Sequence, residues 1–175
     1  MAPTVFWRVL RSPLGPLTVV ECDDGPLVIE FAGRPGAESW AERVRARVPG
    51  VTIELGGCDG VVHWLEHYFD GRMAQPAYPE HLARWLAPSA AQEAVWRALC
   101  EIPPGETRSY EDIAHRTGLN PRVVGQLNGA NHLAVLIPCH RVVGKNGALV
   151  GYGGGLDRKR WLLDHELRAV GLGIR

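Results

Sequence analysis

Residues 136–144 read Leu-Ile-Pro-Cys-His-Arg-Val-Val-Gly, which sets a thiol beside an imidazole between two apolar runs. Short continuous apolar runs are typical of buried segments, so the pattern indicates that Cys139 is held in the wall of a core. A thiol reacts as its thiolate, and a nearby histidine such as His140 lowers the thiol pKa from about 8.5. Most buried cysteines serve only as small hydrophobic residues, so the pair alone leaves both interpretations open.

Composition places the chain among ordinary globular proteins. It has 175 residues, of which 46% are hydrophobic and 22% charged. No apolar run approaches the roughly 20 residues that cross a membrane. Residues 1–8 lack the basic start and long apolar segment of a signal peptide. We therefore expect a cytoplasmic protein that makes no membrane contact.

The four cysteines give little support to a metal site. Cys22, Cys58, Cys100 and Cys139 lie far apart and show no CxxC spacing. In the cytoplasm they are expected to be thiols. A metal bound by Cys22, Cys58 and scattered histidines has weak support from spacing. We expect neither a metal nor another cofactor.

Charge is distributed unevenly along a chain whose formal net charge is zero. Residues 1–106 hold 9 basic and 14 acidic side chains, whereas residues 107–160 hold 8 basic and 3 acidic ones. A basic segment in a neutral protein is consistent with a local anionic partner such as nucleic acid. A solvated charged surface gives the same count, so charge alone does not decide.

The first half of the chain predicts a small α/β domain with antiparallel strands, residues 1–80. Short apolar runs separated by turn residues predict a strand meander, and helical spacing follows. The predicted strands are 6–10, 17–21, 27–31 and 51–55, and the predicted helices are 38–48 and 61–69. Three prolines within residues 72–88 predict an extended connection.

The second half, residues 81–175, predicts a mainly helical domain containing a helix-turn-helix. Ser89 and Ser109 fit N-caps, because Gln92 and Asp112 follow them by three residues. Two further helices, 110–117 and 121–130, flank a turn at Gly118. Many such helix pairs do not bind DNA, so the pattern alone is a moderate signal.

Glycines and basic residues near the nucleophile allow two interpretations each. Gly125 and Gly129 share a helix face, which suits close packing against another helix or the approach of a DNA strand. The glycine-rich loop 150–155 predicts a flexible pocket wall with Tyr152 able to stack on a base. The last helix is predicted over 156–165, with Glu166 at its end. Its basic run 158–160 predicts a solvated face, with phosphate contact as the alternative.

Residues of about 89–166 resemble the catalytic domain of the O6-alkylguanine-DNA alkyltransferases, the methylated-DNA–protein-cysteine methyltransferases. Residues 4–75 resemble the N-terminal domain of that family only loosely. The matching positions occur in the family's order. They are Tyr110, Arg122, Asn128, Asn131, the run PCHRVVG at 138–144, the loop GYGGG at 151–155, and Glu166.

The resemblance implies repair of double-stranded DNA that carries O6-alkylguanine. The target atom lies inside the duplex, so the nucleotide must rotate out at a cost of a few kcal/mol. Arg122 is expected to fill the vacated place, and Tyr110 to lie beside the rotated phosphate and protonate the base. The recognition helix is expected in the minor groove, which is about 6 Å wide. The other DNA-binding residues implied are Val123, Gly125, Gln126, Asn128 and Gly129.

The resemblance also assigns the chemistry. Cys139 attacks the alkyl carbon, His140 takes the thiol proton through a water, and Glu166 orients the imidazole. Asn131 is expected to hold the turn before the nucleophile, and Arg141 to form a structural ion pair. The base pocket is expected to be lined by Val142, Tyr152, Gly153 and Gly154. The thioether product is stable, so each molecule, expected to be a monomer, acts once as a suicide enzyme.

Two positions depart from the family pattern. His132 replaces the usual proline and is expected to loosen the turn. Leu127 replaces a small residue and is expected to bulk up the groove-facing helix. Their effect on DNA affinity stays open, as does a lesion range that extends to O4-alkylthymine.

Two other functions are weighed against alkyl transfer. A protein that binds and flags alkylated DNA without repairing it would lack the nucleophile, and Cys139 argues against it. A cysteine hydrolase would bring Cys139 and His140 together in space rather than in sequence.

Overall fold

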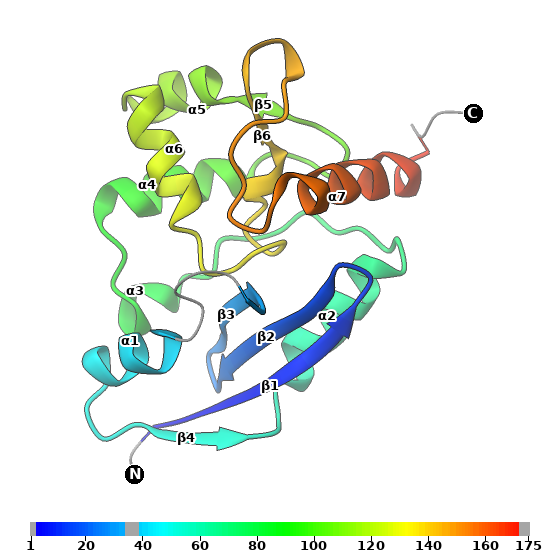
Figure 1. The fold of residues 1–175 in the computed structure, drawn as a ribbon. Coiled ribbons are helices and arrows are strands. Elements are labelled where there is room, and N and C mark those ends of the chain that lie inside the picture. Colours follow the sequence, from blue (N-terminus) through cyan, green and yellow to red (C-terminus); the bar gives the residue numbers. More distant parts are fainter. Residues whose placement is uncertain (1–2, 34–38, 172–175) are drawn as a thin grey trace.

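The computed structural model describes residues 3–33 and 39–171, which form two regions packed together (Figure 1). The first region holds a four-stranded sheet in the order β3-β2-β1-β4. Its strands are β1 (Thr4–Ser12), β2 (Gly15–Cys22), β3 (Gly25–Phe31) and β4 (Thr52–Leu55). The predicted meander is confirmed, because β1, β2 and β3 pair antiparallel. The division of the chain near residue 80 stays a prediction.

Strand β4 runs parallel to β1, which the sequence analysis did not predict. Parallel neighbours need a crossover connection, and helix α1 (Trp40–Arg47) lies in that connection. The helix buries Trp40 and Val44, as their spacing of four predicts. Glu38, where this helix was predicted to begin, lies outside the described residues.

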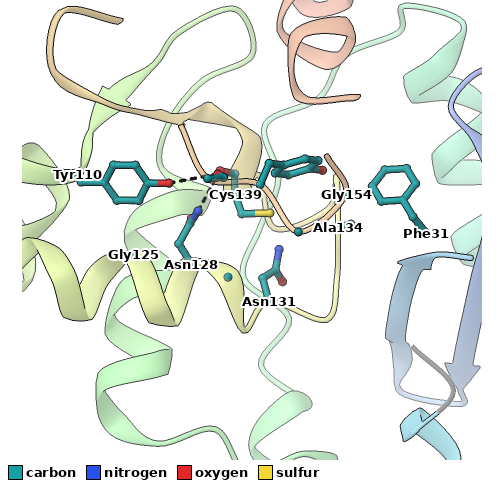
Figure 2. Close-up of a pocket in the computed structure, with 12 residues that line it drawn as sticks. Phe31, Tyr110, Gly125, Asn128, Asn131, Ala134, Cys139 and Gly154 are labelled. Carbon is teal, nitrogen blue, oxygen red and sulfur yellow. Dashed lines mark hydrogen bonds between the residues drawn. The ribbon is translucent and has the colours of Figure 1, made fainter. Parts of the chain in front are cut away.

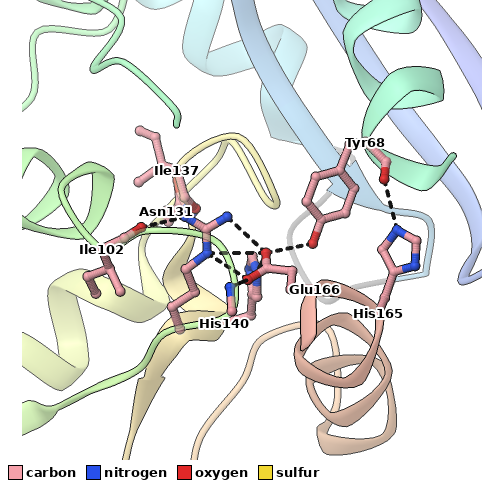
Figure 3. Close-up of polar contacts among 9 residues, drawn as sticks. Tyr68, Ile102, Asn131, Ile137, His140, His165 and Glu166 are labelled. Atoms are coloured by element: carbon pink, nitrogen blue, oxygen red, sulfur yellow. Dashed lines mark hydrogen bonds and ion pairs between the residues drawn. The ribbon is translucent and has the colours of Figure 1, made fainter. Parts of the chain in front are cut away.

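Helix α2 (Asp59–Phe69) begins two residues before its predicted start and packs against β2 and β3. Its apolar face buries Val61, Val62 and Leu65. Tyr68 lies on the same face and is 3% exposed. Its side chain reaches past the sheet towards the second region (Figure 3).

The connection between the two regions is not fully extended, so that prediction was wrong in part. A single helical turn, α3 (Leu82–Trp85), forms within residues 72–88. The turn is anchored because Trp85 Nε1 donates to Asp24 Oδ2 at 2.8 Å, and both Leu82 and Trp85 are buried. The burial of these two side chains therefore outweighs the preference for extended backbone that the three prolines indicate.

The second region is built on helices whose caps were predicted from sequence. Helix α4 (Ala90–Cys100) and helix α5 (Tyr110–Thr117) each begin with a reciprocal capping box, at Ser89 and Ser109. Gly118 ends α5 in the left-handed conformation, with φ of 69°. Asn120 then caps α6 (Pro121–Gly129) by accepting from the Arg122 N–H at 2.8 Å. The predicted helix-turn-helix is confirmed as a structural unit.

The chain then continues through Cys139 to a final helix. A single 3-10 turn, η2 (Cys139–Arg141), leads into β6 (Val142–Val143), which pairs with β5 (Arg108–Ser109). After a further turn, η3 (Lys145–Gly147), the helix α7 (Leu156–Ala169) closes the fold. It ends four residues later than predicted, so Glu166 lies within its last turns. No helix in the described ranges is long and apolar enough to span a membrane.

The edge strand β3 joins the two regions beside the nucleophile. Its Ile29 N–H donates to the His132 carbonyl at 2.8 Å, and its carbonyl accepts from the Ala134 N–H at 2.9 Å. Glu30, 3% exposed, lies 3.4 Å from His132 Nδ1 and 3.1 Å from Arg43. The expectation that His132 loosens this turn stays a prediction; its carbonyl binds β3 and its side chain faces Glu30.

Candidate active site

A cavity of about 160 Å³ opens where the two regions meet, and Cys139 forms part of its wall (Figure 2). The lining comes from Phe31 on β3, Tyr110 on α5, the glycine face of α6 and the loop 151–154. Figure 2 shows the Cys139 sulfur between Tyr110 and Phe31. An apolar cavity of about 150 Å³ holds a benzene-sized molecule, so this space suits one flat ring.

Two asparagines fix the backbone around Cys139. Asn131 Nδ2 donates to the Ile137 carbonyl at 2.8 Å, and its Oδ1 accepts from the Leu133 N–H at 2.9 Å. Asn128 Nδ2 donates to the Cys139 carbonyl at 3.3 Å. Val135 within this turn has φ of 72°, a conformation that strains a β-branched residue by roughly 1–3 kcal/mol. The hydrogen bonds of Asn131 stabilise that strained turn.

The residues that follow Cys139, His140 and Arg141, form a fully buried polar network with Glu166 (Figure 3). His140 Nε2 lies 2.7 Å from Glu166 Oε1, and both side chains are 0% exposed. Arg141 Nε lies 2.9 Å from Glu166 Oε2, and its Nη1 donates to the Ile102 carbonyl at 2.6 Å. The structural ion pair that the sequence analysis expected for Arg141 is therefore made with Glu166.

The protonation states follow from this geometry. Burial by itself would raise the pKa of Glu166, but the hydrogen bonds and charges of His140 and Arg141 outweigh it and hold that pKa well below its usual range. Burial lowers the pKa of His140, although Glu166 opposes the shift. A neutral His140 therefore places its proton on Nε2, facing the carboxylate. Nδ1 is buried and makes no hydrogen bond within the described residues, so it is the nitrogen able to accept a proton.

Tyr110 lines the cavity on the side opposite Phe31 (Figure 2). Burial raises the pKa of Tyr110, and the nearby Cys139 raises it further. The hydroxyl therefore stays protonated at neutral pH. It donates to the Gly151 carbonyl at the long distance of 3.4 Å, so this hydrogen bond is weak and the hydroxyl can exchange it for a better acceptor.

Lys159 is a cation at the site that the sequence analysis missed. It is 0% exposed, and its Nζ donates to the carbonyls of Val142 at 2.6 Å and Val150 at 2.8 Å. Burial lowers its pKa to about 8, and the interaction with Cys139 opposes that shift. A cation close to a thiol favours the thiolate. Lys159 thus ties the pocket loop to β6 and places a positive charge near the Cys139 thiol.

The prediction of a solvated basic face over residues 158–160 was wrong for two of its three members. Besides Lys159, Arg158 is half-buried and donates to the carbonyls of Leu14 and Gly154, each at 2.9 Å. Arg160 is exposed, as predicted. The sequence did hold a pattern that indicates burial of Lys159. The residue shares one helix face with Leu162 and Glu166, because the three recur at helical spacing.

Helix α6 presents an exposed surface beside the cavity. Arg122, Val123 and Gln126 are exposed, whereas Asn128 is buried. A Cβ placed at Gly125 would lie 3.8 Å from Tyr110, and one at Gly129 would meet nothing within 4 Å. Gly129 therefore borders open space, and Gly125 faces Tyr110 on α5 at a distance that would still admit a Cβ.

Leu127 was expected to add bulk to the groove-facing surface of α6, but its side chain does not project from that surface. The side chain is half-buried and packs against the hydrophobic core, while its carbonyl accepts from Trp96 Nε1 at 3.0 Å. The expected widening of the groove-facing surface by this residue was therefore wrong.

The structure brings most of the expected pocket residues together. Tyr152, Gly153 and Gly154 line the cavity with Cys139, whereas Val142 is 0% exposed and lies behind the wall. The backbone of Val142 still contributes by holding Lys159. Phe31 and Ala134 also line the cavity and were missed. Phe31 comes from the first region, so no local pattern pointed to it.

The other three thiols lie away from this cavity. Burial raises the pKa of Cys58 to about 11 and that of Cys100 to about 12. Burial also raises the pKa of Cys22, whose S–H donates to the Gly25 carbonyl at 3.3 Å. These thiols are protonated and poorly nucleophilic at neutral pH. In the described part of the chain, no group of three or more His, Cys, Asp or Glu residues could hold a metal ion.

Comparison with known proteins gives consistent matches. Residues 90–168 match the family model described as the DNA-binding domain of 6-O-methylguanine DNA methyltransferase. The methylated-DNA–protein-cysteine methyltransferase of Mycobacterium tuberculosis is 37% identical over 169 residues, which cover 93% of this chain and 92% of that one. The protein of that name from Mycobacterium leprae is 43% identical over 173 residues, covering 95% and 94%.

A solved structure is similar over the same extent. The crystal structure of Mycobacterium tuberculosis OGT in complex with DNA superposes with a TM-score of 0.74 at 34% identity. The match covers 94% of each chain. Both regions of the fold are therefore shared with that protein.

Proposed function

This chain belongs to the methylated-DNA–protein-cysteine methyltransferases, and on that premise we propose that Cys139 takes the alkyl group from O6-alkylguanine in duplex DNA. Membership of the family makes the chain a DNA-binding enzyme that repairs DNA by direct alkyl transfer. The observation that carries the residue assignment is the placement of Cys139 in the wall of a ring-sized cavity, directly before the buried His140–Glu166 pair.

The chemistry is a displacement at the alkyl carbon. The proton of Cys139 passes to His140 Nδ1 through one water, and Glu166 stabilises the resulting imidazolium. The sulfur then forms a bond to the alkyl carbon while the bond from that carbon to O6 breaks. The electron pair stays on the guanine, which takes a proton from the Tyr110 hydroxyl, and the proton held on His140 returns to Tyr110 through water. The thiolate is a poor leaving group from the alkyl carbon of the thioether on Cys139, so each molecule acts once.

Access to the alkyl carbon requires the nucleotide to leave the duplex. Arg122, Val123 and Gln126 are exposed on α6, the helix whose Gly125 and Gly129 line the cavity. We propose that α6 enters the minor groove and that Arg122 occupies the place of the rotated base. The turn-forming hydrogen bonds of Asn131 and Asn128 keep Cys139 in position during this step.

Intact mass measurement tests the function directly. The protein is incubated with duplex DNA that contains one O6-methylguanine, and the alkylated residue is mapped by peptide mass. We expect one added methyl group per molecule, on Cys139, and no second turnover. Absence of the methyl group, or its presence on Cys22, Cys58 or Cys100, would contradict the proposal.

Arg122→Ala tests the role of α6. Arg122 is exposed, and its guanidinium makes no hydrogen bond or ion pair to the part of the chain that the structure describes, so the free energy of unfolding should change by less than about 0.5 kcal/mol. Loss of the side chain that fills the vacancy should slow methyl transfer from duplex DNA by at least about tenfold, because the few kcal/mol of base rotation are no longer offset. The rate is measured by quenched time points and intact mass.

The matched control is Arg116→Ala, which removes another exposed arginine that pairs with Glu101 at the end of α5. This variant should transfer at close to the wild-type rate. Equal slowing of both variants would assign the effect to lost positive charge and not to the position of Arg122.

The setting of the reaction follows from two observations. All four cysteines are thiols, which suits a reducing compartment, so we propose the cytoplasm. The cavity is lined by residues from both regions of the same chain and needs no residue from a second copy, so we propose that the protein acts as a monomer.

A further inference from the structure

Glu166 receives a hydrogen bond from outside the second region. The hydroxyl of Tyr68, on α2, donates to Glu166 Oε1 at 2.8 Å (Figure 3). This is the same oxygen that lies 2.7 Å from His140 Nε2. Tyr68 is 3% exposed, so water does not compete for its hydroxyl. The first region therefore contributes a polar group to the histidine–carboxylate pair.

The Tyr68 ring is held firmly by its neighbours. It stacks on Trp64 with ring centroids 5.8 Å apart, and Phe69 meets it edge-on at 5.5 Å. His165 Nε2 donates to the Tyr68 carbonyl at 2.8 Å, and the two rings lie 5.5 Å apart. These contacts position the ring without any help from the hydroxyl, whose hydrogen bond to Glu166 is an additional feature.

The carboxylate has other donors that bind it without Tyr68. Arg141 donates to both oxygens through Nε and to Oε1 through Nη2 at 2.9 Å, and the Gly105 N–H donates to Oε2 at 3.1 Å. Arg141 alone supplies a paired cation and a bidentate geometry. The hydroxyl of Tyr68 is therefore not needed to keep Glu166 ionised or bound.

We propose that Tyr68 is a positioning residue of the transfer reaction, which restrains the pull of Glu166 on His140 so that the imidazole stays neutral until it receives the thiol proton. This inference rests on the proposed function. The positive end of the O–H dipole lies on the oxygen that faces the imidazole. It reduces the negative potential at the ring and so disfavours the imidazolium.

The direction of the effect follows from the groups around the ring. His140 faces Glu166 and Tyr68, with the cations Arg141 and Lys159 also acting on it, and Cys139 precedes it in η2. Of these, only Glu166 favours the imidazolium. Removing the Tyr68 hydroxyl leaves more negative charge facing the ring, which favours the imidazolium and raises the pKa of His140. Because the reaction needs a neutral imidazole to take the thiol proton, the acidic limb of the rate profile should move to higher pH.

Tyr68→Phe is the informative variant, because phenylalanine keeps the ring contacts and removes only the hydroxyl. Methyl transfer from O6-methylguanine duplex DNA is measured between about pH 5 and pH 9 for the wild type and the variant. The expected result is a shift of the acidic limb to higher pH by about half a unit or more, which corresponds to roughly a threefold slower rate at a fixed pH on that limb.

Tyr78→Phe is the matched control. The Tyr78 hydroxyl is buried and makes no hydrogen bond within the described residues, and the residue lies outside the polar network. Its removal should leave the pH profile unchanged. A second variant, Tyr68→Met, removes ring and hydroxyl together and should show the same shift, with a larger loss of thermal stability.

The outcomes separate this inference from the proposed function. A wild type that takes up no methyl group overturns the function itself. An active wild type with an unshifted Tyr68→Phe profile, a shift to lower pH, or an equal shift in Tyr78→Phe overturns the inference alone. Failure of both Tyr68 variants to fold would assign the residue a purely structural role and would also overturn it.

Discussion

Cys139→Ser is expected to abolish methyl transfer while DNA binding stays within about twofold of the wild type, a difference below 0.5 kcal/mol. The side chain is 7% exposed and differs from serine by one atom, so the turn held by Asn131 and Asn128 is kept. A hydroxyl is far less acidic than a thiol, and His140 has too low a pKa to deprotonate it appreciably. The reaction therefore loses its nucleophile and not its binding surface.

Two measurements check this result. Intact mass should show no added methyl group after prolonged incubation, and titration with fluorescent duplex DNA should give a near wild-type dissociation constant. Cys22→Ser is the matched control, because serine can keep the hydrogen bond that the Cys22 S–H gives to the Gly25 carbonyl. It should transfer normally. Residual transfer in Cys139→Ser at more than a trace would place the accepting atom elsewhere.

Arg141→Met is expected to destabilise the protein by about 3–5 kcal/mol, the largest stability effect anticipated for a single substitution here. Arg141 is 1% exposed and pairs with Glu166, which is 0% exposed. Methionine fills similar space but leaves a buried carboxylate without its cation and the Ile102 carbonyl without its donor. Urea unfolding at neutral pH measures the change.

The pH dependence of stability gives an independent check. The pKa of Glu166 is lower in the folded protein than in the unfolded chain, where it is about 4.3. The stabilisation is therefore fully present above the unfolded value and is lost as the pH falls below it towards the folded value. In Arg141→Met the folded pKa rises, so the loss of stability on acidification from about pH 5 should become shallower.

Arg97→Met provides the comparison. Arg97 pairs with Glu80 and Glu93 at the surface, where its side chain is 40% exposed. Exposed pairs of this kind contribute about 1 kcal/mol or less. A similar destabilisation by both substitutions would show that burial does not set the energy of the Arg141 pair.

Local chemistry explains which parts of the fold were predictable from sequence. Ser89 and Ser109 were identified as caps because Gln92 and Asp112 lie three residues further along the chain. The three antiparallel strands were found from short apolar runs between turn residues. The parallel pairing of β4 with β1 was not, since it depends on a crossover between residues about 50 positions apart.

The same distinction holds at the site. Cys139, His140, Asn131 and Glu166 were recognised through a family resemblance in a contiguous part of the chain, and their roles in this protein stay proposals. Phe31 and Tyr68 come from the first region and approach the site only through the tertiary fold. Lys159 was misassigned because its neighbours in sequence are charged, although its burial among three carbonyl groups decides its environment.

The contact between β3 and the second region limits how far this protein can be shortened without losing activity. A fragment that starts at residue 81 retains the thiol, the imidazole and the glutamate, and includes all residues matched by the family model. It discards the Ile29 backbone that binds His132 and Ala134, together with the Phe31 side of the cavity. Such a truncation keeps every reactive group but removes the contacts that hold these groups in place. A shortened version of the protein therefore has to retain the sheet.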